Sequence, residues 1–76
     1  MKKLLENIIK GIVKNPDSVN IIEYDNNDEV VFEIHVDPQD VGQIIGKDGR
    51  TIKSINTLLT AAKKDENTKF LLKVIR

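Results

Sequence analysis

The chain begins with a helical hydrophobic pattern. Apolar residues recur every three or four positions over residues 2–14, which predicts an amphipathic helix with one apolar stripe. The stripe consists of Leu4, Leu5, Ile8, Ile9, Ile12 and Val13. Asn15-Pro16-Asp17 ends this helix, because the residue before a proline is pushed out of the helical region.

Residues 19–25 and 29–36 predict two strands, because both are rich in β-favouring residues and the second alternates. One face of the second strand holds Val30, Phe32, Ile34 and Val36, and the other holds Val31, Glu33, His35 and Asp37. Asn26-Asn27-Asp28 predicts a turn, since Asn and Asp tolerate positive φ. We therefore expect a hairpin with His35 on its polar face, as an exposed or hydrogen-bonded surface histidine.

A short helix is predicted after the hairpin. Asp37 suits the N-cap, Pro38 the first helical position, and Asp40 the first turn, where the helix dipole favours an anion. Gly46 follows only eight residues after Pro38, so this helix ends there.

A longer helix and a strand complete the chain. The helix begins near Gly49 or Arg50, and its buried stripe is predicted as Ile52, Ile55, Leu58, Leu59 and Ala62. A loop over residues 65–68 precedes the strand. In that strand Phe70, Leu72 and Val74 alternate with Leu71, Lys73 and Ile75.

The element order is α-β-β-α-α-β, which predicts a single α+β domain over residues 1–76. Three strands form one sheet and three helices pack on one of its faces. Leu71 and Ile75 lie on the weaker face of the last strand, so some apolar surface is left uncovered.

Composition excludes several kinds of chemistry. The chain of 76 residues has no cysteine and one histidine, so a disulfide framework, a thiolate metal site and a cysteine nucleophile are impossible. Asp37 and Asp40 are explained by helix capping, so no catalytic residues, metal ligands or cofactors are expected. No apolar run approaches the roughly 18 residues of a membrane span. The N-terminus lacks the cleavage site of a signal peptide, and we expect a cytoplasmic protein.

The net charge of zero conceals an uneven distribution. Residues 1–37 hold four basic and eight acidic side chains, whereas residues 38–76 hold eight basic and four acidic ones. A neutral protein with a basic half can present a positive face to an anion, although a mixed soluble surface explains the same numbers.

The informative segment is VGQIIGKDGRTIKSI, residues 41–55, centred on Gly46-Lys47-Asp48-Gly49. A GxxG spacing alone is weak evidence, since a C-cap glycine followed by a turn glycine produces it without any ligand. Here it joins two amphipathic helices, so the turn exposes backbone N–H groups beside a helix N-terminus. That arrangement suits a phosphate, which can approach the backbone closely where glycine leaves space.

Residues around the loop also suit the binding of a phosphate backbone. Lys47 stands at the tip, and Arg50 and Lys53 follow it. Gly42, inside a helix, costs up to about 1 kcal/mol relative to alanine. Either a neighbouring element packs closely there or something flat lies against the backbone. The apolar side chains that could floor a groove beside it are Val41, Ile44 and Ile45.

This segment resembles the V/I-G-x-x-I-G-K-x-G-x-x-I pattern of a type II KH domain. The whole chain is similar to the small stand-alone bacterial KH proteins of the KhpA family. The usual Asp-Asp-Val-Gly of that family is matched by residues 38–42 and its Gly-Lys-x-Gly-Arg-Thr by residues 46–51. Two residues depart from the family pattern: Ile52 stands for alanine and Asn56 for arginine.

The resemblance implies a non-catalytic protein that binds single-stranded RNA, as an RNA chaperone or post-transcriptional regulator. The GxxG loop would hold the sugar-phosphate backbone beside a groove for about four nucleotides. The implied RNA-binding residues are Gly42, Ile44, Ile45, Gly46, Lys47, Asp48, Gly49, Arg50 and Lys53. A strand residue within 30–36 is expected nearest the groove. The resemblance also implies a homodimer, or a heterodimer with a Jag/KhpB-type KH protein.

Two alternatives remain at this point. The loop could be only a turn, in a protein-interaction module built on a KH-like scaffold. Single-stranded DNA could replace RNA in the groove. The dimer interface is expected on the third helix, near Thr57 or Thr60. Phe32 and Phe70 are predicted in the core rather than as a stacking platform, so one domain should bind RNA weakly.

Overall fold

The computed structural model describes residues 1–63 and 69–75. Its helices are α1 (Lys2–Ile12), α2 (Val41–Ile45) and α3 (Arg50–Ala62), and its strands are β1 (Asn20–Asn26), β2 (Glu29–His35) and β3 (Lys69–Ile75). Short 3₁₀ turns, Pro16–Ser18, Pro38–Asp40 and Lys47–Gly49, lie at three of the junctions. The predicted element order is confirmed, while the predicted loop at 65–68 lies outside the described residues.

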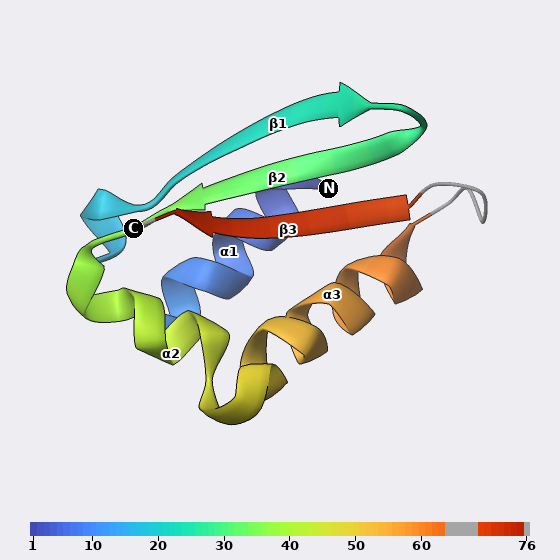
Figure 1. The fold of residues 1–76 in the computed structure, drawn as a ribbon. Helices are drawn as coiled ribbons and strands as arrows, with labels where there is room; N and C mark the ends of the chain where they lie inside the picture. Colours follow the sequence, from blue (N-terminus) through green and yellow to red (C-terminus); the bar gives the residue numbers. More distant parts are fainter. Residues whose placement is uncertain (64–68, 76) are drawn as a thin grey trace.

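The strands form one mixed sheet in the order β1-β2-β3 (Figure 1). β1 and β2 are antiparallel and joined by a two-residue turn, in which Asn27 and Asp28 have φ of 49° and 68°. Positive φ at both central residues twists the turn in the same sense as the strands, and Asn and Asp accept it at low cost. β3 pairs with β2 in parallel, so the chain between them must cross over the sheet.

The crossover is made of α2, the GKDG loop and α3, and it lies with α1 on one face of the sheet (Figure 1). The core between these layers contains Phe32 and Ile34 of β2, Leu5 and Ile9 of α1, Ile44, Ile55 and Leu59. The predicted α+β class, with three helices beside a three-stranded sheet, is therefore confirmed. None of the helices in the described ranges is long and apolar enough to cross a membrane.

Several predicted element details are wrong. α1 ends at Ile12 rather than residue 14, because Val13 is already extended, although its side chain stays buried. Leu58 is 54% exposed and Ala62 is also exposed. The buried stripe of α3 is narrower than predicted because the helix lies beside β3 at the border of a small sheet, and only Ile55 and Leu59 are buried.

Candidate functional site

The segment before α2 is fixed by two carboxylates. The Asp37 carboxylate accepts a hydrogen bond from the Gln39 N–H at 2.9 Å, which confirms Asp37 as the cap. The turn that it caps is a 3₁₀ turn, and the α-helix proper begins at Val41. Pro38 occupies the first position of that turn, so its ring stands at the entrance to α2.

Asp40 has a structural role that the sequence did not reveal. It is fully buried, and its carboxylate accepts hydrogen bonds from the N–H groups of Lys14 and Asn15 at 3.0 Å and from Asn15 Nδ2 at 3.1 Å. The Lys14 N–H bond, opposed by burial and aided by Asn15, lowers the pKa of Asp40. Asp40 thus ties the end of α1 to the start of α2, rather than serving mainly the helix dipole.

The GKDG loop consists of tight turns, with no room for a side chain at Gly46. Gly46 has φ 75° and ψ 174°, a conformation almost confined to glycine. A Cβ added there would overlap Thr51 Oγ1 and lie 2.8 Å from the Thr51 backbone nitrogen. Asp48 and Gly49 are both left-handed, with φ of 57° and 74°. The Gly49 N–H donates to the Gly46 carbonyl at 3.2 Å and closes the turn.

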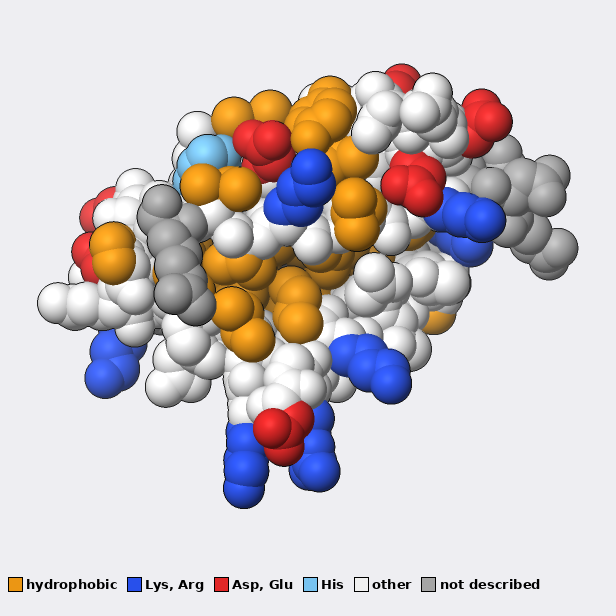
Figure 2. Space-filling view, viewed as in Figure 1, with side chains coloured by type: hydrophobic (Ala, Val, Ile, Leu, Met, Phe, Trp, Pro, Cys, Tyr) orange, Lys and Arg blue, Asp and Glu red, His pale blue; other side chains and the backbone are white. Residues whose placement is uncertain are grey.

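The loop also leaves backbone donors available. Among the described residues, no backbone hydrogen bond uses the N–H of Lys47 or Asp48. The Lys47 and Asp48 side chains are exposed, at the corner where α2 meets α3. In Figure 2 this corner projects from the molecule and carries basic side chains on both sides of an acidic one. Free N–H groups and cations at one corner form an environment suited to an anion.

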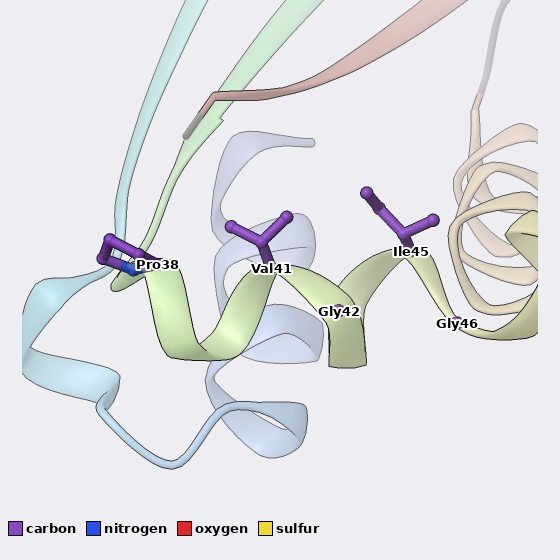
Figure 3. A pocket seen from close by; sticks show the side chains of 5 residues that line it. All are labelled: Pro38, Val41, Gly42, Ile45 and Gly46. Carbon is purple, nitrogen blue, oxygen red and sulfur yellow. The ribbon is translucent and has the colours of Figure 1, made fainter.

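A shallow apolar groove of about 510 Å³ lies directly beside the loop (Figure 3). Its lining residues are Pro38, Val41, Gly42, Ile45 and Gly46. A Cβ on Gly42 would meet no atom of the described residues within 4 Å, so none of the described elements packs against this glycine. Of the two explanations for a glycine here, open access to the backbone therefore fits the described part of the chain.

Two expectations about the groove are wrong. Ile44 is fully buried in the core and faces away from the groove, because it points to the sheet from the opposite side of α2. The strand nearest to α2 is β3, and none of residues 30–36 lines the groove. Pro38 was missed, although its position three residues before Val41 places both on one side of a helical turn.

The remaining predicted residues divide between two surfaces. Gly42, Ile45 and Gly46 line the groove, whereas Arg50 and Lys53 line a second hollow of about 560 Å³ on α3, with Ser54, Thr57 and Leu58. Lys47, Asp48 and Gly49 form the loop between them. Of the predicted cations, Lys47 therefore lies in the loop beside the groove, whereas Arg50 and Lys53 lie on α3, outside the residues that line it.

The two residues that depart from the family pattern both lie on α3. Ile52 packs partly buried against the core, so its larger side chain fills space inside the domain. Asn56 Oδ1 accepts a hydrogen bond at 3.2 Å from Thr60 Oγ1, one turn further along α3. The described residues contain no group of three or more metal-ligating side chains.

Comparison with known proteins gives a consistent result. The family model described as "KhpA/KhpB, KH domain" matches residues 2–74. The chain belongs to this family. A protein of Thermotoga maritima named RNA-binding protein KhpA is 51% identical over 76 residues, covering all of both chains. Proteins of the same name from Clostridium acetobutylicum and Chlamydia trachomatis are 40% and 39% identical over 75 residues, covering 99% of this chain and 100% and 96% of theirs.

The match extends over the whole KH fold, including both helices of the crossover and the loop between them. The predicted resemblance to the KhpA family is thereby confirmed. No solved structure gives a significant match to the chain.

Proposed function

We propose that this protein binds single-stranded RNA without catalysis, through the GKDG loop and the groove beside α2. The observation that carries the proposal is the open Gly42 backbone, next to a loop with free N–H donors. Membership of a family whose relatives are named RNA-binding proteins supports the same function.

In this proposal the loop holds the sugar-phosphate backbone. The N–H groups of Lys47 and Asp48 donate to phosphate oxygens, and the Lys47 ammonium adds a charge-assisted contact. Arg50 and Lys53, near the start of α3, supply positive potential along the RNA strand. The absence of a side chain at Gly49, where a Cβ would meet no described atom, allows the backbone of the RNA to come close.

The bases would lie over Pro38, Val41, Gly42 and Ile45, in the groove shown in Figure 3. No aromatic side chain lines this groove. Phe32 is fully buried and Phe70 packs on it with a centroid distance of 5.9 Å, which confirms that both belong to the core. Without base–aromatic stacking, worth about 1–3 kcal/mol per base, one domain should bind with micromolar or weaker affinity.

Weak binding by one groove suits a protein that acts as a dimer. Two grooves on one assembly raise the apparent affinity through effective concentration. We therefore include in the proposal a homodimer, or a heterodimer with a KhpB-type KH protein, acting on RNA as a chaperone or post-transcriptional regulator.

The test compares RNA binding by wild type, Lys47→Asp and Lys3→Asp. Both variants make the same charge change at an exposed lysine, but Lys3 lies on α1, away from the loop. Fluorescence anisotropy with a random single-stranded RNA pool at low salt should show at least tenfold weaker binding for Lys47→Asp only. Circular dichroism would establish that all three proteins are folded.

The competing function is a protein-interaction module, and the exposed apolar side chains of the sheet favour it. If folded wild type binds no RNA, or if both lysine variants bind like wild type, the GKDG loop is only a turn and this second function is preferred. Parallel titrations with DNA of matched sequence decide whether the groove discriminates between the two sugars.

A further inference from the structure

Helix α2 is too short to hold its own position. It has five residues, which span about 7.5 Å along the helix axis. A helix of this length is not stable by itself in water, so contacts with the rest of the fold must fix it. Every described residue that lines the groove belongs to α2 or to the turns at its two ends. The shape of the groove therefore depends on what holds α2 in place.

Two fully buried side chains, Asp40 and Ile44, fix the inner face of this segment. Ile44 enters the hydrophobic core, and Asp40 lies four residues earlier, on the same side of the helical turn. Val41 and Ile45 are also four residues apart, and both point to the same side of α2 in Figure 3. Holding the inner pair therefore also sets the direction of the pair that lines the groove.

Asp40 is held by the end of α1. Its Oδ1 accepts a hydrogen bond from the Lys14 N–H at 3.0 Å, and its Oδ2 accepts bonds from the Asn15 N–H at 3.0 Å and from Asn15 Nδ2 at 3.1 Å. We call these three residues and their bonds the Asp40 clamp. Both oxygens are engaged in a buried position, so the carboxylate cannot turn without leaving a charged group short of partners. The clamp therefore favours one arrangement of α2 against α1.

We propose that Asp40 is a positioning residue for RNA binding. The Asp40 clamp fixes α2 in the orientation that forms the groove and places the GKDG loop at its end. This inference rests on the proposed function, because it concerns the same groove. Asp40 acts through α2 rather than by touching RNA, since its side chain is fully buried.

The clamp affects affinity through the population of the correct arrangement. When the binding-competent arrangement is only partly populated, the apparent Kd rises by the reciprocal of that fraction. If loss of the clamp leaves this arrangement populated about one fifth of the time, RNA should bind about fivefold more weakly. The chain can lose this affinity while the core between the helices and the sheet stays folded.

The charge of Asp40 gives the test a definite sign. Asp40→Asn removes a negative charge close to a site for a polyanion, and Coulomb attraction alone should then make RNA bind more tightly. Loss of positioning should make it bind more weakly. Weaker binding by Asp40→Asn is therefore not an effect of charge.

The test compares the RNA affinity of wild type with Asp40→Asn and two matched controls, Asp17→Asn and Leu59→Val. Asp17 is exposed on the turn that follows α1, so its variant makes the same charge change outside the clamp. Leu59 is buried near the far end of α3, so its variant lowers stability away from α2. Fluorescence anisotropy with the single-stranded RNA pool should show about fivefold weaker binding for Asp40→Asn, and binding within about twofold of wild type for both controls. Circular dichroism establishes that each protein is folded at the temperature used.

Hydrogen exchange without RNA provides a second measurement on the same proteins. The Gly46 N–H donates to the Gly42 carbonyl at 2.9 Å, so its exchange reports opening of α2. It should exchange severalfold faster in Asp40→Asn than in wild type and Asp17→Asn. Asn15→Ala removes only the bond from Asn15 Nδ2, should show smaller effects of the same sign on exchange and affinity, and decides the question if Asp40→Asn does not fold.

The inference is overturned if Asp40→Asn and Asn15→Ala bind RNA as tightly as wild type or more tightly. It is also overturned if Leu59→Val loses as much affinity as Asp40→Asn, since lower stability would then explain the loss. Absence of RNA binding by wild type overturns the proposed function and this inference together. If Lys47→Asp weakens binding but Asp40→Asn does not, the proposed function stands and only the positioning role of Asp40 is rejected.

Discussion

Three glycines around α2 differ in what a side chain would meet. At Gly46 the backbone conformation excludes other residues and Thr51 fills the space of a Cβ. At Gly49 the backbone is left-handed but the space is open, and at Gly42 the conformation is helical and the space is open. Gly46 is therefore required both by its backbone conformation and by the space that Thr51 fills. Gly49 is required only by its positive φ, and neither reason applies to Gly42.

This difference leads to a graded stability prediction. Gly49→Ala should lower the free energy of unfolding by about 1 kcal/mol, the usual cost of a left-handed non-glycine residue. Gly46→Ala should cost about 3 kcal/mol or more, because the overlap with Thr51 adds to a nearly forbidden backbone. Urea unfolding of both variants provides the measurement. Equal losses would mean that Thr51 moves away freely.

Gly42→Ala separates stability from binding. The substitution should leave the fold intact or stabilise it by up to about 1 kcal/mol, because alanine is the better helix former and no described atom lies within 4 Å of its Cβ. If bases lie against this backbone, the methyl group should weaken RNA binding severalfold. A variant that is stable and still binds RNA like wild type would place the bases elsewhere.

The buried Asp40 carboxylate, just before α2, is expected to stabilise the fold. Asp40→Asn should lower Tm by roughly 10 °C, because an amide NH₂ replaces one of the oxygens that accept hydrogen bonds from Lys14 and Asn15. Glu6→Gln is the control, since the Glu6 side chain bonds to Lys10 and to no other described residue. Its effect on Tm, measured by circular dichroism, should be much smaller.

The Asp40 carboxylate makes the stability of the fold depend on pH. The pKa of Asp40 is lower in the folded protein than in the unfolded chain, so its contribution to stability is complete above the unfolded value. That contribution should be lost as the pH falls below about 4 toward the lowered folded pKa. Thermal melts between pH 7 and pH 2 should show a smaller acid-dependent loss in Asp40→Asn than in wild type.

These residues also indicate how far the sequence could be interpreted. Asp37 was predicted correctly as a cap because its partner, Gln39, is two residues away. Asp40 could not be predicted, because its partners lie about 25 residues earlier and only the folded chain brings them together. The burial of Ile44 and the open space at Gly42 likewise depend on how α2 is rotated against the sheet.

At the scale of elements, the sequence predicts a boundary well where a single residue ends a helix or strand. Pro16, the two-residue turn after β1 and Gly46 fixed most boundaries to within two residues. The width of a buried stripe is different, since it depends on the neighbours that cover it. α3 meets β3, α1 and α2 on one side only, so Leu58 lies outside the contact although its spacing fits a broad apolar stripe.

Adjacent leucines on α3 test this assignment of faces. Leu59→Ala should lower the free energy of unfolding by about 2–5 kcal/mol, because the side chain is fully buried in the core. Leu58→Ala should change it by less than about 0.5 kcal/mol, as expected of an exposed position. Urea unfolding of the two variants is the measurement. A comparable loss for Leu58→Ala would show that this side chain is covered in solution.

At the scale of the whole molecule, a zero net charge does not describe the surface that an anion would meet. The acidic side chains of the first half are concentrated in β1, β2 and their turn, whereas Lys47 lies in the GKDG loop and Arg50 and Lys53 lie on α3. The fold separates these groups, since the turn and the GKDG loop lie at different corners (Figure 1). The protein can therefore attract a phosphate backbone locally while remaining neutral overall.

This separation predicts the salt dependence of RNA binding. If Lys47, Arg50 and Lys53 neutralise three phosphates, the logarithm of the binding constant should fall with the logarithm of salt concentration at a slope of about −2 for a single strand. Lys47→Ala should reduce that slope by about 0.7, one phosphate's share, whereas Lys3→Ala on α1 should leave it unchanged. Anisotropy titrations between about 30 and 300 mM KCl give both slopes. A wild-type slope near zero would mean that contacts other than phosphates carry the binding, and an unchanged slope in Lys47→Ala would remove this lysine from the phosphate path even if the RNA still occupies the groove.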